Sequence, residues 1–501
     1  MLERGFAEMV SFAELAIQNP WWENPAAIDA DPKVKEFEAA QVKWMPRIRR
    51  HINLQKDVLY SLRGPRQVGK TTLVKLIIKD ELKERNPADI FYYTCDLVNE
   101  PAELKGILEQ FLDWSQRQSA GRKLVCLDEV TRVKDWENAY KQTIDLRSLE
   151  NTTYILTGSS SWDLKHGVER LPGRKGEATG EQNNKVLLPP KFAEYAELRN
   201  PTLHNAIRKL GLDSNAVRIE AFSNLTSGKA EKWLDPLLPH ARELDALFDE
   251  YLLTGGVMTA TNQFCKKKEI PNSTYELYLQ MFFGDLARLG REESTAKKIL
   301  SSVLNHPQQH VGWQTICRET GIPSAVTVMS YVDVLQNLFV LNAYNAFDQN
   351  KKRPKHRSEK KLQIPNPFFF HAFRSYLENP AGDYFHQANT FLAKPEGKAA
   401  LAEFVVGDHL TRLAYNHKPS DLFDQTNSVF YAKNAAGETI DFITRLPGAF
   451  MPVEVKYQSS ISSADYRNLK KFNSGILATK DELAPHGRHP AIPVPLLLLF
   501  V

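Results

Sequence analysis

Residues 58–80 read VLYSLRGPRQVGKTTLVKLIIKD and carry the strongest structural signal in this chain of 501 residues. The stretch begins with the apolar residues of a buried strand and ends with apolar residues at helical spacing, Leu73, Leu76 and Ile77. Between them, residues 64–71 have the pattern G-x-x-x-x-G-K-T. In a strand–loop–helix context this pattern predicts a phosphate-binding loop, because glycines let backbone amides approach phosphates and the helix N-terminus adds partial positive charge.

The loop predicts which residues contact a nucleotide. Lys70 is expected to reach the β- and γ-phosphates, and Thr71 is expected to bind Mg²⁺. The residues expected to contact the nucleotide are Gly64, Pro65, Arg66, Gln67, Val68, Gly69, Lys70, Thr71 and Thr72. The expected cofactors are therefore Mg²⁺ and ATP, although the loop alone is equally consistent with GTP.

Two later stretches complete the predicted site. Residues 123–130, KLVCLDEV, predict a buried strand that ends in Asp128 and Glu129. Asp128 is expected to hold the water shell of Mg²⁺, and Glu129 is expected to polarise the attacking water. Residues 153–161, TYILTGSSS, predict a third strand that ends in hydroxyl groups, where a γ-phosphate sensor would lie. The three stretches together predict nucleotide hydrolysis.

Composition sets wider limits on the fold and on the location of the chain. Hydrophobic residues make up 42% and charged residues 25% of the chain, as in globular proteins, and the net charge of +4 is too small to be diagnostic. The length predicts about three domains. Four scattered cysteines without a CxxC pair exclude a zinc ribbon and indicate buried thiols in a reducing compartment. No signal-peptide core or membrane-length apolar run is present, so we expect a cytoplasmic protein without membrane contact.

Several motifs resemble one protein family. GPRQVGKTTL, LVCLDEV, ILTGSS and LPGR (171–174), with LLPPKFAEY (187–195) and YLLTGG (251–256), are similar to the AAA+-type P-loop ATPases of a widespread prokaryotic group. In that group the ATPase core is followed by a domain of unknown assigned function with a nuclease-like end. The resemblance implies that Thr157 and Ser159 are sensor positions and that Arg174 stabilises charge at the γ-phosphate. The alternative for Arg174 is a solvated loop arginine.

The middle of the chain has the pattern of a winged helix-turn-helix. Residues 297–347 predict a helix, a second helix, a Gly-Ile-Pro-Ser turn, a third helix over about 324–337 and a strand, with Ser324 as the N-cap of the third helix. The basic run from Lys351 to Lys361, KKRPKHRSEKK, follows as the expected wing. A basic hairpin there is suited to contact the phosphates of DNA. Two alternatives stay open, a solvated loop and a module that binds only protein.

Residues 437–457, GETIDFITRLPGAFMPVEVKY, predict a β-hairpin from their alternation of polar and apolar residues. A turn centred between Pro447 and Gly448 would place Asp441 directly opposite Glu454, with Lys456 on the same face. Two carboxylates held so close repel each other unless a cation lies between them. A divalent metal ion and a lysine would supply the positive charge.

The hairpin and the preceding helix resemble the PD-(D/E)XK nuclease superfamily. The resemblance implies that Glu403, Asp441 and Glu454 hold Mg²⁺ and that Lys456 activates water for cleavage of DNA. The superfamily often has Glu two residues before the strand Asp, but here Thr439 stands there and Glu438 is displaced by one. The alternative is an inactive domain that recognises DNA or a partner, with its carboxylates paired with Lys456.

These inferences define an α/β multidomain protein in four parts. We expect an N-terminal extension (1–50), an AAA+ P-loop core with a helical lid (51–290), a winged helix (291–375) and a PD-(D/E)XK-like α/β domain (376–501). The predicted function is ATP hydrolysis coupled to DNA binding, with Mg²⁺-dependent cleavage as a further option. The alternative is an ATP-dependent switch that acts on a protein partner and has an inactive nuclease-like domain. Association with further copies of the chain is left open.

Overall fold

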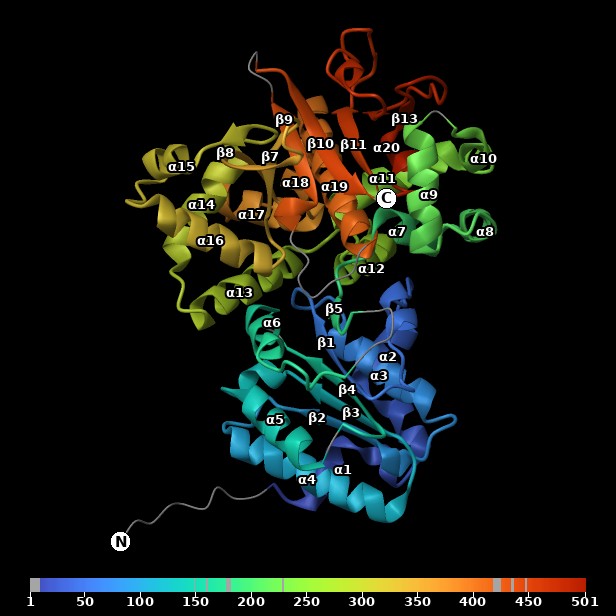
Figure 1. Cartoon of the computed structure of the whole chain (residues 1–501), viewed down its shortest axis with the longest axis vertical. Coiled ribbons are helices and arrows are strands. Elements are labelled where there is room, and N and C mark those ends of the chain that lie inside the picture. The colour runs from blue at the N-terminus through green and yellow to red at the C-terminus, as the bar shows by residue number, and fades with distance from the viewer. Residues whose placement is uncertain are drawn as a thin grey trace. The chain divides into compact units, whose positions relative to one another are not determined.

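The computed structural model describes residues 10–147, 149–158, 161–176, 182–227, 229–417, 425–433, 437–446 and 448–501. The chain divides into two compact units, Met1–Leu188 and Pro189–Val501. In Figure 1 the first unit runs from blue to teal and the second from green to red. The helices between residues 189 and 290, which we expected to form a lid on the ATPase core, belong to the second unit. The finer four-part division stays a prediction.

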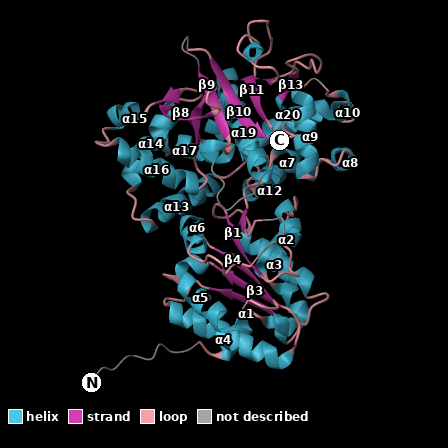
Figure 2. Cartoon of the chain, in the orientation of Figure 1, coloured by secondary structure: helices cyan, strands magenta, loops and turns pink. Residues whose placement is uncertain are grey.

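The first unit alternates strands and helices, as Figure 2 shows. Its strands are β1 (Val58–Arg63), β2 (Ile90–Thr94), β3 (Lys123–Asp128), β4 (Thr152–Thr157) and β5 (Asn184–Val186). Its α-helices are α1 (Phe12–Gln18), α2 (Pro32–Ala39), α3 (Lys70–Glu81), α4 (Pro101–Gln118), α5 (Trp136–Arg147) and α6 (Ser161–Glu169). Its 3₁₀ turns are η1 (Pro20–Trp22), η2 (Pro25–Ala30), η3 (Arg47–His51), η4 (Pro87–Asp89) and η5 (Val130–Arg132).

The sheet of the first unit is parallel, and within the described ranges its strand order is β2-β3-β4-β1-β5. Parallel strands place all their carboxyl ends at one edge, which is where ligands bind in open α/β sheets. The phosphate loop after β1, Asp128 at the end of β3 and Thr157 at the end of β4 therefore share that edge. The predicted strand–loop–helix and the second and third predicted strands are confirmed.

Both faces of this sheet are buried, which explains why its strands are almost continuously apolar. On one face Leu59, Phe91 and Val125 pack with residues of α4, α5 and α6. On the other face Tyr60, Tyr92 and Cys126 pack with residues of α3 and with Trp21. The N-terminal segment thus contributes to the core of the first unit, and Trp21 and Trp22 pack against its sheet.

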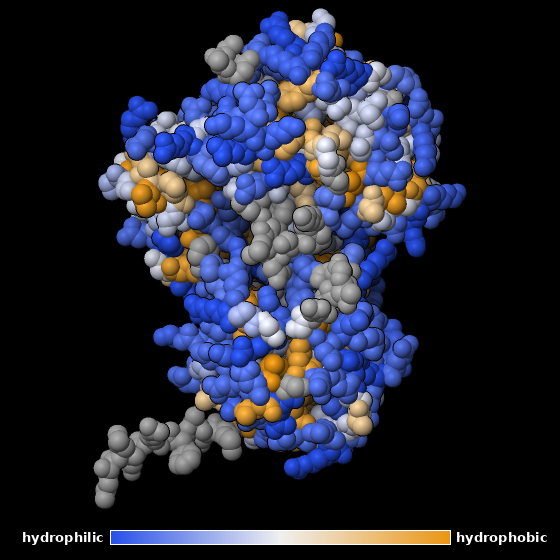
Figure 3. Space-filling model, viewed as in Figure 1, coloured by the Kyte–Doolittle hydropathy of each residue, from blue (hydrophilic) through white to orange (hydrophobic). Residues whose placement is uncertain are grey.

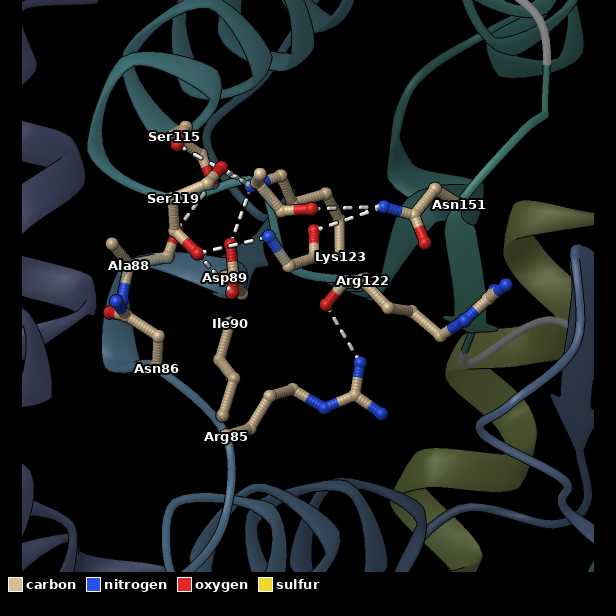
Figure 4. A network of polar contacts seen from close by, with 12 residues as sticks. Arg85, Asn86, Ala88, Asp89, Ile90, Ser115, Ser119, Arg122, Lys123 and Asn151 are labelled. Carbon is tan, nitrogen blue, oxygen red and sulfur yellow. Dashed lines mark hydrogen bonds and ion pairs between the residues drawn. The ribbon is translucent and has the colours of Figure 1, made fainter.

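A buried polar network lies at the amino ends of β2 and β3, at the edge of the sheet opposite the phosphate loop (Figure 4). Asp89 and Lys123, exposed by 1% and 8%, form an ion pair of 2.5 Å between the amino ends of β2 and β3. The Lys123 ammonium also donates to the Ser119 carbonyl at 2.7 Å, and the Ser119 hydroxyl donates to Asp89 at 2.8 Å. These bonds attach the end of α4 to two strands.

We expect Asp89→Ala to destabilise the first unit strongly, because it leaves the Lys123 ammonium buried without its carboxylate. Loss of one partner of a buried pair costs about 3–5 kcal/mol, which corresponds to a fall of about 10 °C in the unfolding midpoint. The matched control is Asp57→Ala, since Asp57 pairs with the neighbouring Arg122 at a more exposed position and should cost less than about 1 kcal/mol. Equal midpoints for the two variants in calorimetry would contradict this role of Asp89.

The second unit combines many helices with one mixed sheet. Its strands are β6 (His310–Val311), β7 (Asn342–Asp348), β8 (Arg353–Gln363), β9 (Val429–Lys433), β10 (Thr439–Leu446), β11 (Ala449–Lys456), β12 (Ile476–Thr479) and β13 (Ala491–Pro493). Its helices up to the hairpin strands are α7 (Phe192–Arg199), α8 (Pro201–Lys209), α9 (Asn215–Thr226), α10 (Glu231–Leu234), α11 (Ala241–Thr254), α12 (Met258–Lys267), α13 (Asn272–Arg288), α14 (Glu293–Asn305), α15 (Trp313–Thr320), α16 (Ala325–Asn337), α17 (Pro367–Glu378), α18 (Tyr384–Leu392) and α19 (Pro395–His417). A short helix, α20 (Val494–Leu497), follows β13.

The helix–turn–helix series predicted for the middle of the chain is present as α14, α15 and α16, followed by β7. Gly321 ends α15 in the left-handed conformation, and the Ser324 hydroxyl caps α16 by accepting the Val326 N–H at 3.2 Å. Strands β7 and β8 do not form a separate sheet: the order is β13-β12-β11-β10-β9-β7-β8-β6 in the part of the second unit that the structure describes. Assignment of this segment to the winged-helix class stays a prediction.

The hairpin of β10 and β11 has the predicted register. Phe442 pairs with Val453 and Leu446 pairs with Ala449, while Pro447 lies outside the described residues. Continued by one residue, this register opposes Asp441 to Glu454. The Asp441 N–H accordingly donates to a Glu454 carboxylate oxygen at 3.2 Å. A shift in the pairing of β10 with β9 between Ile440 and Ile443 marks a β-bulge at this point, a feature that often re-aims a side chain.

The expectations about the cysteines and about membrane-spanning helices can also be compared with the structure. Cys95, Cys126 and Cys317 are buried, Cys265 is partly buried, and all four thiols are free. Across the described ranges, no helix combines the length and the apolar composition needed to cross a membrane.

Candidate functional site

The phosphate loop connects β1 to the first residue of α3. Gly64 is required by close approach, because a Cβ atom there would lie 1.9 Å from the Leu187 carbonyl oxygen. Gly69 has a φ of 100°, a conformation that L side chains rarely adopt. The two glycines of the motif are therefore needed for different reasons. Gly64 allows the backbone to pack closely against Leu187, and Gly69 allows a backbone turn with positive φ at the start of α3.

Lys70 begins α3 and lies across its own loop. The side chain is 7% exposed, and its ammonium donates to the carbonyls of Gly64 at 2.9 Å and Pro65 at 3.0 Å. The Lys70 ammonium therefore already lies beside the phosphate loop. This position is needed if the ammonium and the loop are to contact the same phosphates. Arg66, Gln67, Val68 and Thr72 complete the predicted contact set, and Gln67 has a positive φ of 58° within the loop.

The Asp128 carboxylate is the centre of the site. It is 3% exposed and accepts hydrogen bonds from three hydroxyl groups. The Thr71 hydroxyl donates at 2.7 Å from α3 and the Tyr92 hydroxyl at 3.0 Å from β2, while the Thr157 hydroxyl donates from β4. Three elements from different parts of the sequence therefore converge on one carboxylate.

The chemistry of this arrangement fits Mg²⁺. Mg²⁺ prefers oxygen ligands and usually binds through one or two carboxylates, retained water and substrate phosphates. Because the Thr71 hydroxyl donates its hydrogen bond to Asp128, its lone pairs stay available to a cation. Thr71 and Asp128 are thus suited to hold the ion together with a nucleotide.

Glu129 follows Asp128 directly and has an unusual backbone. Its φ is 54°, which is rare for a residue other than glycine, and its N–H donates to the Thr157 hydroxyl oxygen at 3.3 Å. Residues held in sparsely populated conformations cost about 1–3 kcal/mol and cluster at functional sites. The side chain is half-buried at the same edge of the sheet, where a residue that orients water is needed.

The remaining predicted residues of this site have mixed positions. Thr157 contacts Asp128, whereas Ser159 lies outside the described residues. The Arg174 guanidinium contacts both carboxylate oxygens of Asp145, at 2.7 Å and 3.2 Å. Arg174 must leave Asp145 before it can reach a γ-phosphate, so its role stays a prediction.

A second group of charged residues lies around the hairpin of the second unit. The Val455 N–H donates to Asp441 at 2.9 Å, and the Lys456 ammonium contacts Glu454 at 2.7 Å. Lys456 is therefore paired with the carboxylate two residues before it. Glu438, the residue displaced by one from the superfamily position, contacts Lys471.

Lys361 also belongs to this group, although its place in the basic run predicts an exposed side chain. Lys361 is 1% exposed, and its ammonium lies 2.6 Å from Glu403 and 3.0 Å from Asp441. Gln363 and Gln308 also donate to Glu403, at 2.9 Å and 2.6 Å. A lysine thus bridges the two carboxylates that a metal ion would have to bridge.

The pKa values of this cluster follow from burial and from these contacts. Burial would lower the pKa of Lys361, but Asp441 and Glu403 outweigh it and hold the pKa above its usual range. Burial would raise the pKa of Asp441, but Lys361 and Lys456 keep it below its usual range. Burial and the Asp441 charge raise the pKa of Glu454 to about 8. Burial likewise raises the pKa of Glu403, although Lys361 opposes this effect. The lysines therefore keep Asp441 ionised, whereas Glu454 favours its protonated form at neutral pH.

These residues do not fit the metal site that the nuclease resemblance implies. In the described part of the chain, no group of three His, Cys, Asp or Glu side chains is arranged to hold a metal ion. A cation between Glu403 and Asp441 would meet the Lys361 ammonium. Neighbouring His310 stacks on Tyr431 at 4.0 Å, and burial and Lys361 lower its pKa to about 4, so it adds no positive charge at neutral pH.

The basic run, Lys351–Lys361, forms the turn before β8 and most of that strand. Lys351, Lys352, Arg353, Lys355 and Arg357 are exposed, whereas Lys360 and Lys361 are buried. The exposed Arg445 of β10 extends this surface and donates to the Lys352 carbonyl at 3.1 Å. Figure 3 shows a strongly hydrophilic surface over this side of the second unit.

Comparison with protein families supports the first of these sites. A family model described as an AAA domain matches residues 56–196, from before β1 to the end of the sheet and beyond. This match covers most of the first unit and ends within α7 of the second. Two models described as domains of unknown function, DUF8612 and DUF4143, match residues 245–378 and 398–497 of the second unit.

Comparison with individual proteins is less specific. An uncharacterised protein of Methanocaldococcus jannaschii is 23% identical over 335 residues, which cover 64% of this chain and 63% of that relative. The chain thus matches less than two thirds of the relative's length.

Three solved structures have a partial likeness to the chain. A Walker-type ATPase of Pyrococcus abyssi is 14% identical with a TM-score of 0.38, covering 63% of this chain and 91% of the other. The ORC1 protein of Aeropyrum pernix, solved with DNA, is 11% identical with a TM-score of 0.27, covering 72% and 92%. A RuvB mutant of Thermotoga maritima is 16% identical with a TM-score of 0.23, covering 57% and 81%. These low scores do not establish a shared fold over the whole chain.

The lysine between the acids leads to a test with metal ions. We expect Mg²⁺ or Mn²⁺ to raise the unfolding midpoint of wild type no more than that of Glu403→Gln, because Lys361 already supplies the positive charge. Lys361→Met should lower the stability by about 3–5 kcal/mol, since it removes the buried ammonium that pairs with both Glu403 and Asp441. Mn²⁺ should recover part of that loss only in Lys361→Met, measured by thermal unfolding. Metal stabilisation of wild type that is absent from Glu403→Gln would contradict this account of the cluster.

Proposed function

We propose that the first unit binds ATP with Mg²⁺ and hydrolyses it to ADP and phosphate. The observation that carries this proposal is the hydrogen bond of 2.7 Å between Thr71 and Asp128. It joins the helix that follows the phosphate loop to the acidic end of β3, and so brings together the two groups on which Mg²⁺ binding depends. The match of residues 56–196 to an AAA domain supports the same function.

Each residue then has a chemical role. Thr71 and Asp128 would hold Mg²⁺, which would supply positive charge against the negative charge that develops on the phosphates. Lys70 exchanges its two carbonyl partners for phosphate oxygens. Glu129 orients a water molecule in line with the γ-phosphorus and accepts its proton as the new P–O bond forms and the bond to ADP breaks. Thr157 and Ser159 serve as sensors, and Arg174 contributes charge after it leaves Asp145.

Two substitutions separate binding from hydrolysis. Lys70→Ala should abolish tight binding of Mg·ATP, because the phosphates lose the buried cation of the loop. Glu129→Gln should bind nucleotide with unchanged affinity but hydrolyse it at least about 100-fold more slowly, since a positioned general base contributes about 10²–10⁴. Calorimetry and phosphate release measure the two effects, and Glu84→Gln, at an exposed position, is the control. Equal turnover by wild type and Glu129→Gln would remove Glu129 from the mechanism.

For the second unit we propose that the basic run, in the hairpin of β7 and β8, contacts DNA. We also propose that the nucleotide state of the first unit controls this contact. Five exposed lysine and arginine side chains between residues 351 and 357, together with Arg445, support a phosphate contact. We do not propose DNA cleavage for this unit, because the Lys361 ammonium lies between Glu403 and Asp441, where a metal ion would have to bind. The second unit is then a DNA-recognition platform.

A second candidate is a protein partner on α16. This helix exposes Val326 by 73% and Met329 by 47%, three residues apart and therefore on one face. Its exposed face lacks the basic residues that would meet phosphates. That observation favours a switch in which α16 contacts a protein partner and the basic run before β8 is only a solvated turn.

A salt titration distinguishes the two candidates. The variant with serine at Lys351, Lys352, Arg353, Lys355 and Arg357 should bind DNA more weakly. Its salt dependence should also be flatter, since each lost phosphate contact reduces the slope of log K against log salt by about 0.9. The control carries serine at five scattered exposed positions: Lys83, Lys134, Lys141, Lys209 and Lys232. Fluorescence anisotropy on duplex and single-stranded DNA gives both affinity and slope. If the variant of the basic run and the control have the same affinity and the same salt dependence, the protein-partner candidate is favoured instead.

A further inference from the structure

The N-terminal segment covers the free edge of the first sheet without forming a strand. Strand β2 is the edge strand, and its outward backbone groups are bonded by side chains. Asn19 accepts the Tyr92 N–H at 2.7 Å and donates to the Tyr92 carbonyl at 2.9 Å. Gln18 accepts the Thr94 N–H at 2.8 Å, and Trp21 donates to the Ile90 carbonyl at 3.1 Å. Side chains of residues 18–22 thus replace a neighbouring strand and protect the edge from other pairing.

The middle residue of this edge also reaches the nucleotide site. Tyr92 is 6% exposed, and its hydroxyl donates to the same Asp128 oxygen, Oδ2, that accepts from Thr71. Tyr92 is therefore held on both sides: its backbone is bonded by Asn19, and its hydroxyl is bonded to the residue expected to hold Mg²⁺.

The ring of Tyr92 is fixed by a second contact with the N-terminal segment. The Lys75 ammonium lies 3.2 Å from the ring centroid and 3.2 Å from an Asp31 carboxylate oxygen. Lys75 lies one helical turn after Thr71 on α3, so both side chains are on the same face. A desolvated ammonium over an aromatic face is attracted by the ring. Asp31, Lys75 and Tyr92 thus form a chain of contacts that ends at Asp128.

We infer that Tyr92 is a positioning residue for Asp128, and that residues 18–31 set its position from outside the sheet. This inference rests on the proposed binding of Mg·ATP. Without the Tyr92 hydroxyl, Oδ2 of Asp128 keeps only Thr71 as a donor in the described contacts. The carboxylate then has more freedom to rotate away from the orientation in which it meets the water shell of Mg²⁺. Residues 18–31 are accordingly part of the support of the nucleotide site, through their contacts with Tyr92 and Lys75.

Tyr92→Phe tests this inference with little disturbance, because it removes one oxygen and keeps the ring, its packing and its contact with Lys75. The full chain is titrated with Mg²⁺ in the presence of a fluorescent ATP analogue, and the Mg²⁺ concentration at half-maximal binding is measured. We expect Tyr92→Phe to raise this midpoint about tenfold, the effect of losing one hydrogen bond to a charged group. Asn19→Ala should shift it in the same direction by less.

The matched control is Tyr93→Phe, the next residue of the same strand, which packs in the core on the opposite face of the sheet. It should leave the Mg²⁺ midpoint unchanged, while thermal unfolding of all variants reports any general loss of stability. If wild type binds the analogue with Mg²⁺ and Tyr92→Phe has the same or a lower midpoint, the inference is overturned and the proposed function stands. If wild type binds no nucleotide, both are overturned.

Discussion

The first unit depends on one buried carboxylate and the hydroxyl groups that satisfy it. A carboxylate with 3% exposure is unfavourable unless it is hydrogen-bonded, and Asp128 receives its hydrogen bonds from α3, β2 and β4. The same bonds that make burial tolerable also fix the carboxylate beside the phosphate loop. The parallel sheet makes this convergence possible, because three strand ends and one helix start lie at one edge. Stability and the proposed Mg²⁺ chemistry therefore depend on the same contacts.

Features that depend on neighbouring residues were predictable from the sequence. The phosphate loop, the strand that ends in Asp128 and the register of the hairpin at 441–454 each follow from a short pattern whose period is set by the strand or helix itself. The helix–turn–helix around Ser324 was predictable for the same reason, since glycine and a capping hydroxyl act locally. In these cases the residues that determine the geometry are next to each other in the chain.

Features that depend on distant contacts were not predictable. Lys361 stands in a run of basic residues, and such a run normally indicates a solvated surface. The structure buries its ammonium between Glu403 and Asp441, which lie 42 and 80 positions further along the sequence. Tyr92 reads as an ordinary apolar strand residue, and only the pairing of β2 with β3 brings its hydroxyl to Asp128. The helices between 189 and 290 likewise join the second unit through contacts that no local pattern encodes.

We predict that the first unit works with a metal ion, whereas the acidic cluster around Lys361 in the second unit does not. The most direct test is phosphate release from ATP by the full wild-type chain, measured with Mg²⁺ and again with a chelator, with added DNA examined for breaks in the same reactions. We predict Mg²⁺-dependent release of phosphate while the DNA remains intact. Phosphate release that is absent or independent of Mg²⁺ would contradict the account of Asp128, and Mg²⁺-dependent breaks in the DNA would contradict that of Lys361.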